Sequence, residues 1–231
     1  MKAMILAAGR GERMRPLTDS TPKPLLLAAG KPIIQHTIER LVNAGFNEII
    51  INVAHLGQKI KQTLGNGDQF GASIAYSDEG KTALETAGGI INALPLLGEK
   101  PFLVVNGDLA SNYDFSLLRN QHCDLAHLVL IPNPEHHPEG DFHLSSNQRL
   151  TEKGFPKLTY SGMGVYNPEL FSNIAPGQIK LAPILRRAIS QNRVTGEKFN
   201  GFWMDIGTPE RLKDLQHHYR NVDTSNLSAL D

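Results

Sequence analysis

The feature that most constrains the fold of this chain is the regular alternation of short apolar runs with longer segments of helical periodicity. The runs predicted to be strands are Ala3–Ala8, Glu48–Val53, Ser73–Tyr76, Pro101–Val105 and Leu125–Ile131. The segments predicted to be helices are Ile33–Ala44, Leu56–Leu64, Thr86–Leu97, Leu181–Ile189 and Arg211–Tyr219. Strands that alternate with helices of this length favour a mainly parallel sheet covered on both faces. The predicted fold class is therefore α/β, with three layers around a mainly parallel central sheet.

The length of the chain suits one domain with a buried core. Of its 231 residues, we predict that 1–221 form this domain and that 222–231 form a flexible tail. The character of the sequence changes after Pro132, where prolines and histidines cluster. We therefore predict that residues 132–180 are an insertion that shapes part of a substrate pocket. His136 and His137 within it are predicted to be loop histidines exposed to solvent, because adjacent side chains on an extended chain point in different directions.

Charge and cysteine usage exclude some classes of partner. The chain has 23 Lys and Arg residues and 23 Asp and Glu residues, so we expect no binding to nucleic acid or to an anionic membrane. Cys123 is the only cysteine, which excludes an intrachain disulfide and is typical of a reducing compartment. The apolar run before Gly9 is shorter than a signal peptide requires, and no stretch approaches the length of a membrane span. These observations predict a cytoplasmic protein.

Two glycines and several cations follow the first predicted strand. The glycines are Gly9 and Gly11, and the cations that come after them are Arg10, Arg13, Arg15 and Lys23. Glycines at this place allow the backbone to approach a ligand and to expose N–H groups that cradle phosphates. Arginine and lysine add fixed positive charge. The loop is thus predicted to bind a nucleoside triphosphate, rather than to be a plain turn with solvated arginines.

Two better-known glycine loops do not match. A dinucleotide-binding fingerprint requires a third glycine where this chain has Met14, and a P-loop requires Ser or Thr after Gly30-Lys31, where the chain has Pro32.

A second cluster of polar residues follows a later strand. Asn106, Gly107 and Asp108 come directly after the strand Pro101–Val105. Ligand sites of parallel sheets lie at the carboxyl ends of the strands, so Asp108 should share an edge with the glycine loop. A carboxylate there can hold a hard cation such as Mg²⁺, although a helix cap or a turn would also use an aspartate.

These motifs resemble the sugar-phosphate nucleotidyltransferases, whose signature is G-x-G-T-R-L-x-P-L-T followed by P-K-P. Here the chain reads Gly9-Arg-Gly-Glu-Arg13-Met-Arg-Pro-Leu-Thr18 and then Pro22-Lys23-Pro24, with departures at Glu12 and Met14. The resemblance implies a Rossmann-like nucleotidyltransferase fold. It also implies a reaction in which a sugar 1-phosphate attacks the α-phosphorus of a nucleoside triphosphate and releases pyrophosphate.

The resemblance also assigns roles to individual residues. It implies that Arg13, Lys23 and Asp108 are catalytic, that Asp108 and Asp205 (in Trp203-Met-Asp205-Ile-Gly207) hold Mg²⁺, and that the nucleotide contacts Ala8, Gly9, Gly11, Glu12, Arg13, Lys23, Glu79 and Gly88. For the sugar 1-phosphate it implies Asn106, Asp141, Glu152 and Gly162. The pair Gly88-Gly89 opens a predicted helix, where a flat base could lie against the backbone; a tight loop is the alternative.

The wider pattern, including Leu84-Glu85-Thr86 and Gly140-Asp141-Phe142, resembles the bacterial N-acetylmuramate 1-phosphate uridylyltransferases of cell-wall recycling. This implies UTP as the nucleotide and a monomer or weak homodimer. The alternatives are a glucose 1-phosphate thymidylyl- or uridylyltransferase, a mannose 1-phosphate guanylyltransferase, or an inactive nucleotide-binding regulator. A regulator would be expected to lack Lys23 or one of the two aspartates.

Overall fold

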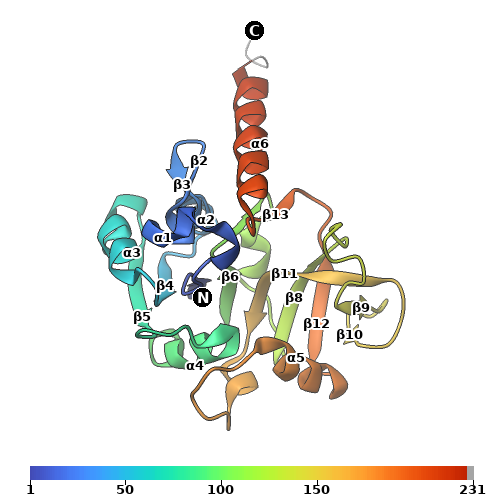
Figure 1. Cartoon of the computed structure of the whole chain (residues 1–231). Helices are drawn as coiled ribbons and strands as arrows, with labels where there is room; N and C mark the ends of the chain where they lie inside the picture. The colour runs from blue at the N-terminus through green and yellow to red at the C-terminus, as the bar shows by residue number, and fades with distance from the viewer. Residues whose placement is uncertain (228–231) are drawn as a thin grey trace.

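The central sheet is mixed, with a parallel half at the N-terminus of the chain. In a computed structural model, which describes residues 1–227, four parallel strands lie in the order β6-β1-β4-β5 (Figure 1). Their bounds are Ala3–Leu6 (β1), Glu48–Val53 (β4), Ser73–Asp78 (β5) and Phe102–Asn106 (β6). These are the first four strands predicted from the sequence, with ends that differ by at most two residues. Their carboxyl ends share one edge of the sheet.

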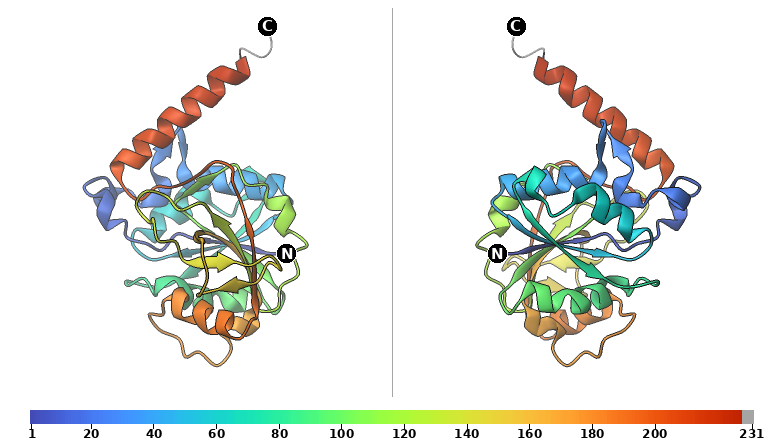
Figure 2. Two further views of the ribbon diagram at one scale, coloured as in Figure 1. Left: turned by 90° about the vertical axis from the view of Figure 1, so that its right-hand side faces the viewer. Right: turned by 90° about the vertical axis from the view of Figure 1, so that its left-hand side faces the viewer.

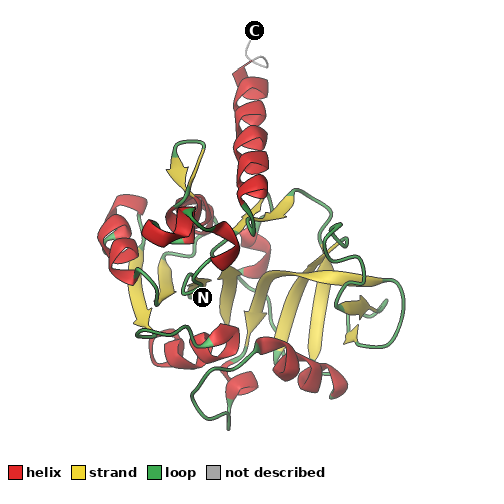
Figure 3. Cartoon of the chain, viewed as in Figure 1, coloured by secondary structure: helices red, strands yellow, loops and turns green. Residues whose placement is uncertain are grey.

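The other half of the sheet is built around one long strand. Strand β11 (Lys157–Tyr166) runs antiparallel to β6 on one side and to β8 (Ala126–Ile131) on the other, and β12 (Val194–Lys198) is parallel to β8. The short strand β9 (Phe142–Leu144) pairs with the start of β11, and β10 (Leu150–Thr151) pairs with β9. Residues 132–180, predicted to be an insertion, therefore contribute a central strand of the main sheet. The pairing of β11 with β6 makes the two halves one sheet, whose strands are yellow in Figure 3.

Helices cover both faces of the sheet, as the alternation in the sequence predicted. Ala3 and Ile5 of β1 belong to the core cluster that includes α2 (Ile33–Asn43) and α3 (Gly57–Leu64). Met4 points to the other face and belongs to the cluster that includes α4 (Glu85–Leu97) and α5 (Leu181–Ser190). Successive side chains of a strand alternate between faces, so a continuous apolar run such as β1 has to be buried on both. The two side views in Figure 2 show the three layers that result.

A third, smaller core joins the glycine loop to the C-terminal helix. Met14 and Ile206 are fully buried there, and they pack with Leu212 and Leu215 of α6 (Pro209–Leu227). Beyond this contact α6 projects away from the body of the molecule (Figure 2). The sequence predicted a helix over Arg211–Tyr219 and a tail from 222, but the helix continues to Leu227; residues 228–231 of the predicted tail lie outside the described residues. In the described part of the chain, no helix is long and apolar enough to cross a membrane.

Small elements complete the edge of the sheet where the strands β1, β4 and β6 end. They are α1 (Leu17–Ser20), the hairpin of β2 (Leu27–Ala28) and β3 (Lys31–Pro32), and the antiparallel pair of β7 (Leu109–Ser111) and β13 (Trp203–Asp205).

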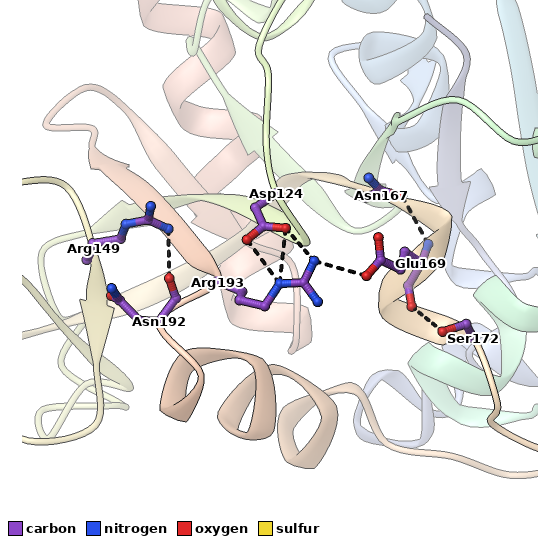
Figure 4. A network of polar contacts seen from close by, with 7 residues as sticks. All are labelled: Asp124, Arg149, Asn167, Glu169, Ser172, Asn192 and Arg193. Atoms are coloured by element: carbon purple, nitrogen blue, oxygen red, sulfur yellow. Dashed lines mark hydrogen bonds and ion pairs between the residues drawn. The ribbon is translucent and has the colours of Figure 1, made fainter.

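The opposite part of the molecule carries a polar network that ties the last strands together (Figure 4). Arg193, just before β12, forms a two-pronged contact with Asp124 at 2.6–3.1 Å and also reaches Glu169 at 2.9 Å. These acidic partners raise the pKa of Arg193. Arg149 donates to the carbonyl of Asn192 at 2.8 Å. These residues do not line the cavity described next, so the network belongs to the scaffold.

Candidate active site

A cavity of about 460 Å³ opens where the parallel strands end. Its walls come from segments that are far apart in the sequence: the loop after β1, the ends of β4, β5 and β6, the start of α4, and the turn after β13. The lining residues are Leu6, Ala7, Ala8, Gly9, Gly11, Glu12, Arg13, Lys23, Pro24, Asn52, Glu79, Ala83, Glu85, Thr86, Asn106, Gly107, Asp108 and Gly207. Most of the residues predicted to bind the nucleotide are among them, and a cavity of this size suits a small-molecule ligand.

The glycine loop is shaped by close packing at Gly11. This residue has a left-handed φ of 69°, and a Cβ there would lie 3.0 Å from Thr18 Cγ2 and 3.2 Å from Lys23 Cβ. The Thr18 hydroxyl donates to the carbonyl of Gly11 at 2.9 Å. A side chain at position 11 would therefore push the loop away from Lys23, whereas glycine permits both the φ and the contact.

The cations of this loop divide into two groups. Arg13 and Lys23 line the cavity. Arg10 and Arg15 are more than half exposed and form surface ion pairs with Glu12 and Asp19, both at 2.7 Å. Surface pairs of this kind contribute little. Only Arg13 and Lys23 are thus placed to act on a ligand in the cavity.

Lys23 and Asp108 meet inside the cavity. Lys23 Nζ forms an ion pair with Asp108 Oδ2, and the lysine side chain is only 12% exposed. Lys23 belongs to a short 3-10 turn after Pro22, while Asp108 follows β6. The two residues are 85 positions apart in the chain. Because both side chains are partly shielded from water, the attraction between the Lys23 ammonium and the Asp108 carboxylate is stronger than it would be at the surface.

The second predicted metal ligand, Asp205, is held on the strand next to Asp108. In the β7–β13 pair Asp205 lies opposite Leu109, and the N–H of Ile206 donates to the carbonyl of Asp108 at 2.8 Å. The ladder therefore brings the backbones of both aspartates together. Asp205 is not among the lining residues of the cavity, although Gly207, two positions later, is.

Two residues that were not predicted contact the Asp205 carboxylate. Arg211 Nη1 lies 2.5 Å from Oδ2, and His136 Nε2 lies 3.3 Å from Oδ1. Arg211 lies in the first turn of α6, where the helix dipole disfavours a cation. Its position at the start of a predicted helix could therefore have indicated a nearby acidic partner. His136 is 42% exposed, which agrees with a loop position, but it is not simply solvated. His137 likewise lies 3.2 Å from Asp141.

Gly207 makes room for this group of charges. A Cβ on Gly207 would lie 3.2 Å from each of Arg13 Nη2, Arg211 Nη1 and Asp205 Oδ2. Two guanidinium groups and one carboxylate thus converge on a position without a side chain.

The side of the cavity at the ends of β4 and β5 is organised by a residue that the sequence analysis did not predict. Asn52 ends the apolar run of β4 and is 3% exposed. Its amide oxygen accepts from the N–H of Ala7 at 2.8 Å, and its amide nitrogen donates to Glu79 Oε1 at 2.6 Å. A polar residue directly after three isoleucines, at the carboxyl edge of a parallel sheet, was the signal that could have found it.

Gly88 is packed against backbone and is not among the lining residues. A Cβ on Gly88 would lie 2.1 Å from the carbonyl oxygen of Gly177. The N–H of Ala87 donates to the carbonyl of Ile179 at 2.9 Å. Gly88 therefore lets the start of α4 approach the loop before α5, which shapes the wall behind the cavity.

The four residues predicted to bind the sugar 1-phosphate are only partly brought together. Asn106 lines the cavity, and Gly162 packs against the Asn106 side chain. The Asp141 carboxylate accepts from the N–H of Tyr160 at 2.8 Å, next to the register shift in β11. Glu152 faces Arg186 at 3.5 Å, with a side chain that is 46% exposed. Neither acidic residue is among those that line the cavity.

The chain matches a known protein family along almost its whole length. The family model described as "Nucleotidyl transferase" matches residues 2–222, and the chain belongs to this family. It is 55% identical to the N-acetylmuramate alpha-1-phosphate uridylyltransferase of Neisseria meningitidis over 94% of this chain and 97% of that one. It is 35% identical to the enzyme of the same name from Caulobacter vibrioides, over 90% of this chain and 92% of that one.

Solved structures show the same fold. A Bacillus anthracis protein assigned as a glucose-1-phosphate thymidylyltransferase superposes with a TM-score of 0.82 at 26% identity, covering 95% of each chain. The chain is thus an α/β nucleotidyltransferase with a mainly parallel central sheet at its core, and the predicted fold class and enzyme class are confirmed.

Gly162 provides a test of how the cavity wall is built. It has a left-handed φ of +81°, and a Cβ there would lie 2.5 Å from Asn106 Nδ2. Gly162→Ala should lose about 1–2 kcal/mol of stability from the backbone conformation and also displace Asn106, which lowers the reaction rate. Gly45→Ala is the matched control, since its φ is +84° and its nearest neighbour is the flexible side chain of Arg119. Thermal unfolding and initial rates of both variants check this; equal rate losses would contradict a role for the Gly162–Asn106 contact.

Proposed function

We propose that this chain transfers a uridylyl group from UTP to N-acetylmuramate 1-phosphate, with release of pyrophosphate and formation of the UDP-sugar. The observation that carries the proposal is the convergence of the Gly9–Arg13 loop, Lys23 and Asp108 on one cavity. The 55% identity to the Neisseria meningitidis uridylyltransferase supports the choice of both substrates.

The chemistry proposed for the cavity needs no general base. A phosphate monoester has its second pKa near 6, so the attacking oxygen of a sugar 1-phosphate is already anionic at neutral pH. The obstacle is repulsion between two polyanions and the charge that grows on the transferred phosphoryl group. Arg13 and Lys23 would offset that charge, and the fixed walls of the cavity would align the reacting groups.

We propose that Mg²⁺ is the cofactor, held by Asp108 and Asp205. Carboxylate oxygens suit this ion, which usually takes one or two of them and completes its shell with water and substrate phosphates. Within residues 1–227 there is no group of three or more His, Cys, Asp or Glu side chains that could hold a metal ion. When bound, the ion would neutralise phosphate charge. The carboxylates would orient it, while Lys23 and Arg211, which now pair with them, would be free to turn toward phosphate.

Pyrophosphate release, measured with every combination of nucleoside triphosphate and sugar 1-phosphate, tests the proposed substrates. We expect UTP with N-acetylmuramate 1-phosphate to give the highest kcat/KM. Higher values with glucose 1-phosphate and thymidine triphosphate, or with mannose 1-phosphate and GTP, would replace the muramate assignment by those alternatives. No release with any combination would point to the inactive regulator.

Asp141 is proposed to contribute to acceptor binding. A carboxylate accepts hydrogen bonds from sugar hydroxyls or from an amide N–H but repels the lactyl carboxylate, so it should face the hydroxyl or acetamido side of the ring. Asp141→Ala should raise the KM for the sugar 1-phosphate by an amount equivalent to about 1–3 kcal/mol and leave the KM for UTP nearly unchanged. Because Asp141 also caps the Tyr160 N–H, some loss of thermal stability is expected as well.

Glu139→Ala removes the same charge from the same exposed loop and is the control for Asp141. If Asp141→Ala weakened UTP binding alone, the loop over 132–141 would not belong to the acceptor site. Glu152 remains a candidate for the acceptor side, on resemblance only.

The setting of the reaction is also part of the proposal. We propose that the enzyme is cytoplasmic, where nucleoside triphosphates are available, and that it serves the recycling of cell-wall peptidoglycan. We propose a single domain over 1–221 that is active as a monomer or weak homodimer, which light scattering on the purified protein would test.

A further inference from the structure

We infer that Asn52 is a positioning residue for nucleotide binding, because it links the phosphate-binding loop to the nucleoside side of the cavity through Glu79. The inference rests on the proposed function, in that the ligand is a nucleoside triphosphate.

Three hydrogen bonds form a chain along the wall of the cavity. The N–H of Ala7 donates to Asn52 Oδ1 at 2.8 Å, Asn52 Nδ2 donates to Glu79 Oε1 at 2.6 Å, and the N–H of Leu84 donates to Glu79 Oε2 at 2.6 Å. The chain connects the ends of β1, β4 and β5 with the segment that precedes α4. The first two bonds join residues 45 and 27 positions apart, so these links are tertiary and do not follow from secondary structure.

The hydrogen-bond chain begins beside the predicted phosphate loop and ends beside the predicted nucleoside wall. Ala7 lies two residues before Gly9, where the phosphate loop begins. Leu84 is followed directly by Glu85 and Thr86, which line the cavity beyond it. The Asn52 and Glu79 side chains therefore connect the phosphate loop to the nucleoside wall, in addition to the backbone ladders of β1, β4 and β5.

The burial of Asn52 makes the arrangement costly to disturb. A buried amide that loses a partner pays the full desolvation cost of the orphaned group. Gly89 closes the site from α4, since a Cβ there would lie 2.5 Å from Glu79 Oε1 and 2.8 Å from Asn52 Nδ2. The amide and the carboxylate consequently have little room to find other partners.

The hydrogen-bond chain also gives Glu79, which lines the cavity, a positioning role. Both of its carboxylate oxygens already accept a hydrogen bond from the protein. These two bonds tie Glu79 to the backbone at Leu84 and to Asn52, and a carboxylate suits this position because both of its neighbours are donors.

Exchange of the acid and the amide tests this logic. Asn52→Asp places two carboxylates against each other, and Glu79→Gln places an amide N–H₂ against a donor, so each single variant breaks the chain. In Asn52→Asp/Glu79→Gln, the carboxylate at position 52 can accept from Ala7 and from the new amide at position 79, whose oxygen can still accept from Leu84. All three hydrogen bonds can form again.

We would measure UTP affinity by calorimetry without sugar phosphate, and KM for both substrates, well below the unfolding temperature. Each single variant should bind UTP at least about tenfold more weakly, the equivalent of one lost hydrogen bond, with the KM for the sugar 1-phosphate changed much less. The double variant should return to within about threefold of the wild type. A purely structural role would instead lower stability and raise both KM values together.

Asn92→Ala is the matched control. Asn92 Nδ2 donates to Ser77 Oγ at 2.9 Å between α4 and β5, and Asn92 does not line the cavity. Its loss should lower the unfolding temperature and leave UTP affinity unchanged. A double variant no better than the singles, or an equal loss of UTP affinity in Asn92→Ala, would overturn the inference. Wild-type protein that binds no UTP would overturn the proposed function, and the inference with it.

Discussion

Asp108→Asn and Asp205→Asn should each remove most of the turnover. If both carboxylates hold one Mg²⁺, either change removes a charged ligand whose contribution to transition-state stabilisation is several kcal/mol. This corresponds to roughly a hundredfold or more in rate. Because the two residues would serve one ion, the double variant should be little worse than either single variant.

The measurement combines a Mg²⁺ titration of the rate with a Mn²⁺ binding assay in the presence of UTP. Electron paramagnetic resonance reports the amount of bound Mn²⁺. Mn²⁺ should bind more weakly to both variants even when no sugar phosphate is present. Asp19→Asn, which removes a surface carboxylate paired with Arg15, is the control and should behave like the wild type. A wild-type rate at ordinary Mg²⁺ in either aspartate variant would remove that residue from the metal site.

Lys23→Ala should lower the rate by roughly a hundredfold or more, the loss expected when a preorganised charge is taken from a transferring phosphoryl group. Lys23 is mostly buried and lies beside Asp108 in the cavity. Its removal would therefore also leave a carboxylate without its cation. Arg13→Ala should have an effect of the same order, because Arg13 lines the same cavity.

Arg10→Ala is the control for both changes. Arg10 belongs to the same loop and carries the same charge, but it is exposed and paired with Glu12, so its removal should change the rate only slightly. Single-turnover kinetics with saturating UTP separate chemistry from binding. An unchanged rate for Lys23→Ala, or equal losses for Arg10→Ala and Arg13→Ala, would contradict the division of these cations into two groups.

Local patterns in the sequence predicted much of the site, because its main parts follow strand ends. Gly9 and Gly11 after β1 and Asp108 after β6 were expected on one edge of a parallel sheet, and the cavity lies there. The motif around Asp205 was expected to join them, and the β7–β13 ladder brings its backbone next to that of Asp108. Short-range periodicity and the parallel-sheet rule were sufficient for these residues.

Side-chain partners were not predictable in the same way. Asp141 was predicted as a substrate ligand by resemblance, and the sequence did not show that its carboxylate also accepts from the Tyr160 N–H beside an irregularity in β11. His136 looked like a solvated residue, yet it reaches Asp205. Such contacts depend on the path of a loop and on side-chain rotamers, which no local periodicity encodes.

The sequence by itself determined the class of fold, the edge of the sheet that carries the site, and the cations and carboxylates that gather there. These follow from apolar periodicity and from glycine and charge at strand ends, which are properties of short segments. Only the tertiary structure decided that β11 is a central strand, that Arg211 and His136 contact Asp205, and that Asn52 and Glu79 connect the two sides of the cavity. The antiparallel position of β11 and the buried hydrogen bonds between distant segments depend on the packing of the whole chain. Each buried polar group needs a partner, and folding of the core decides which distant group supplies it.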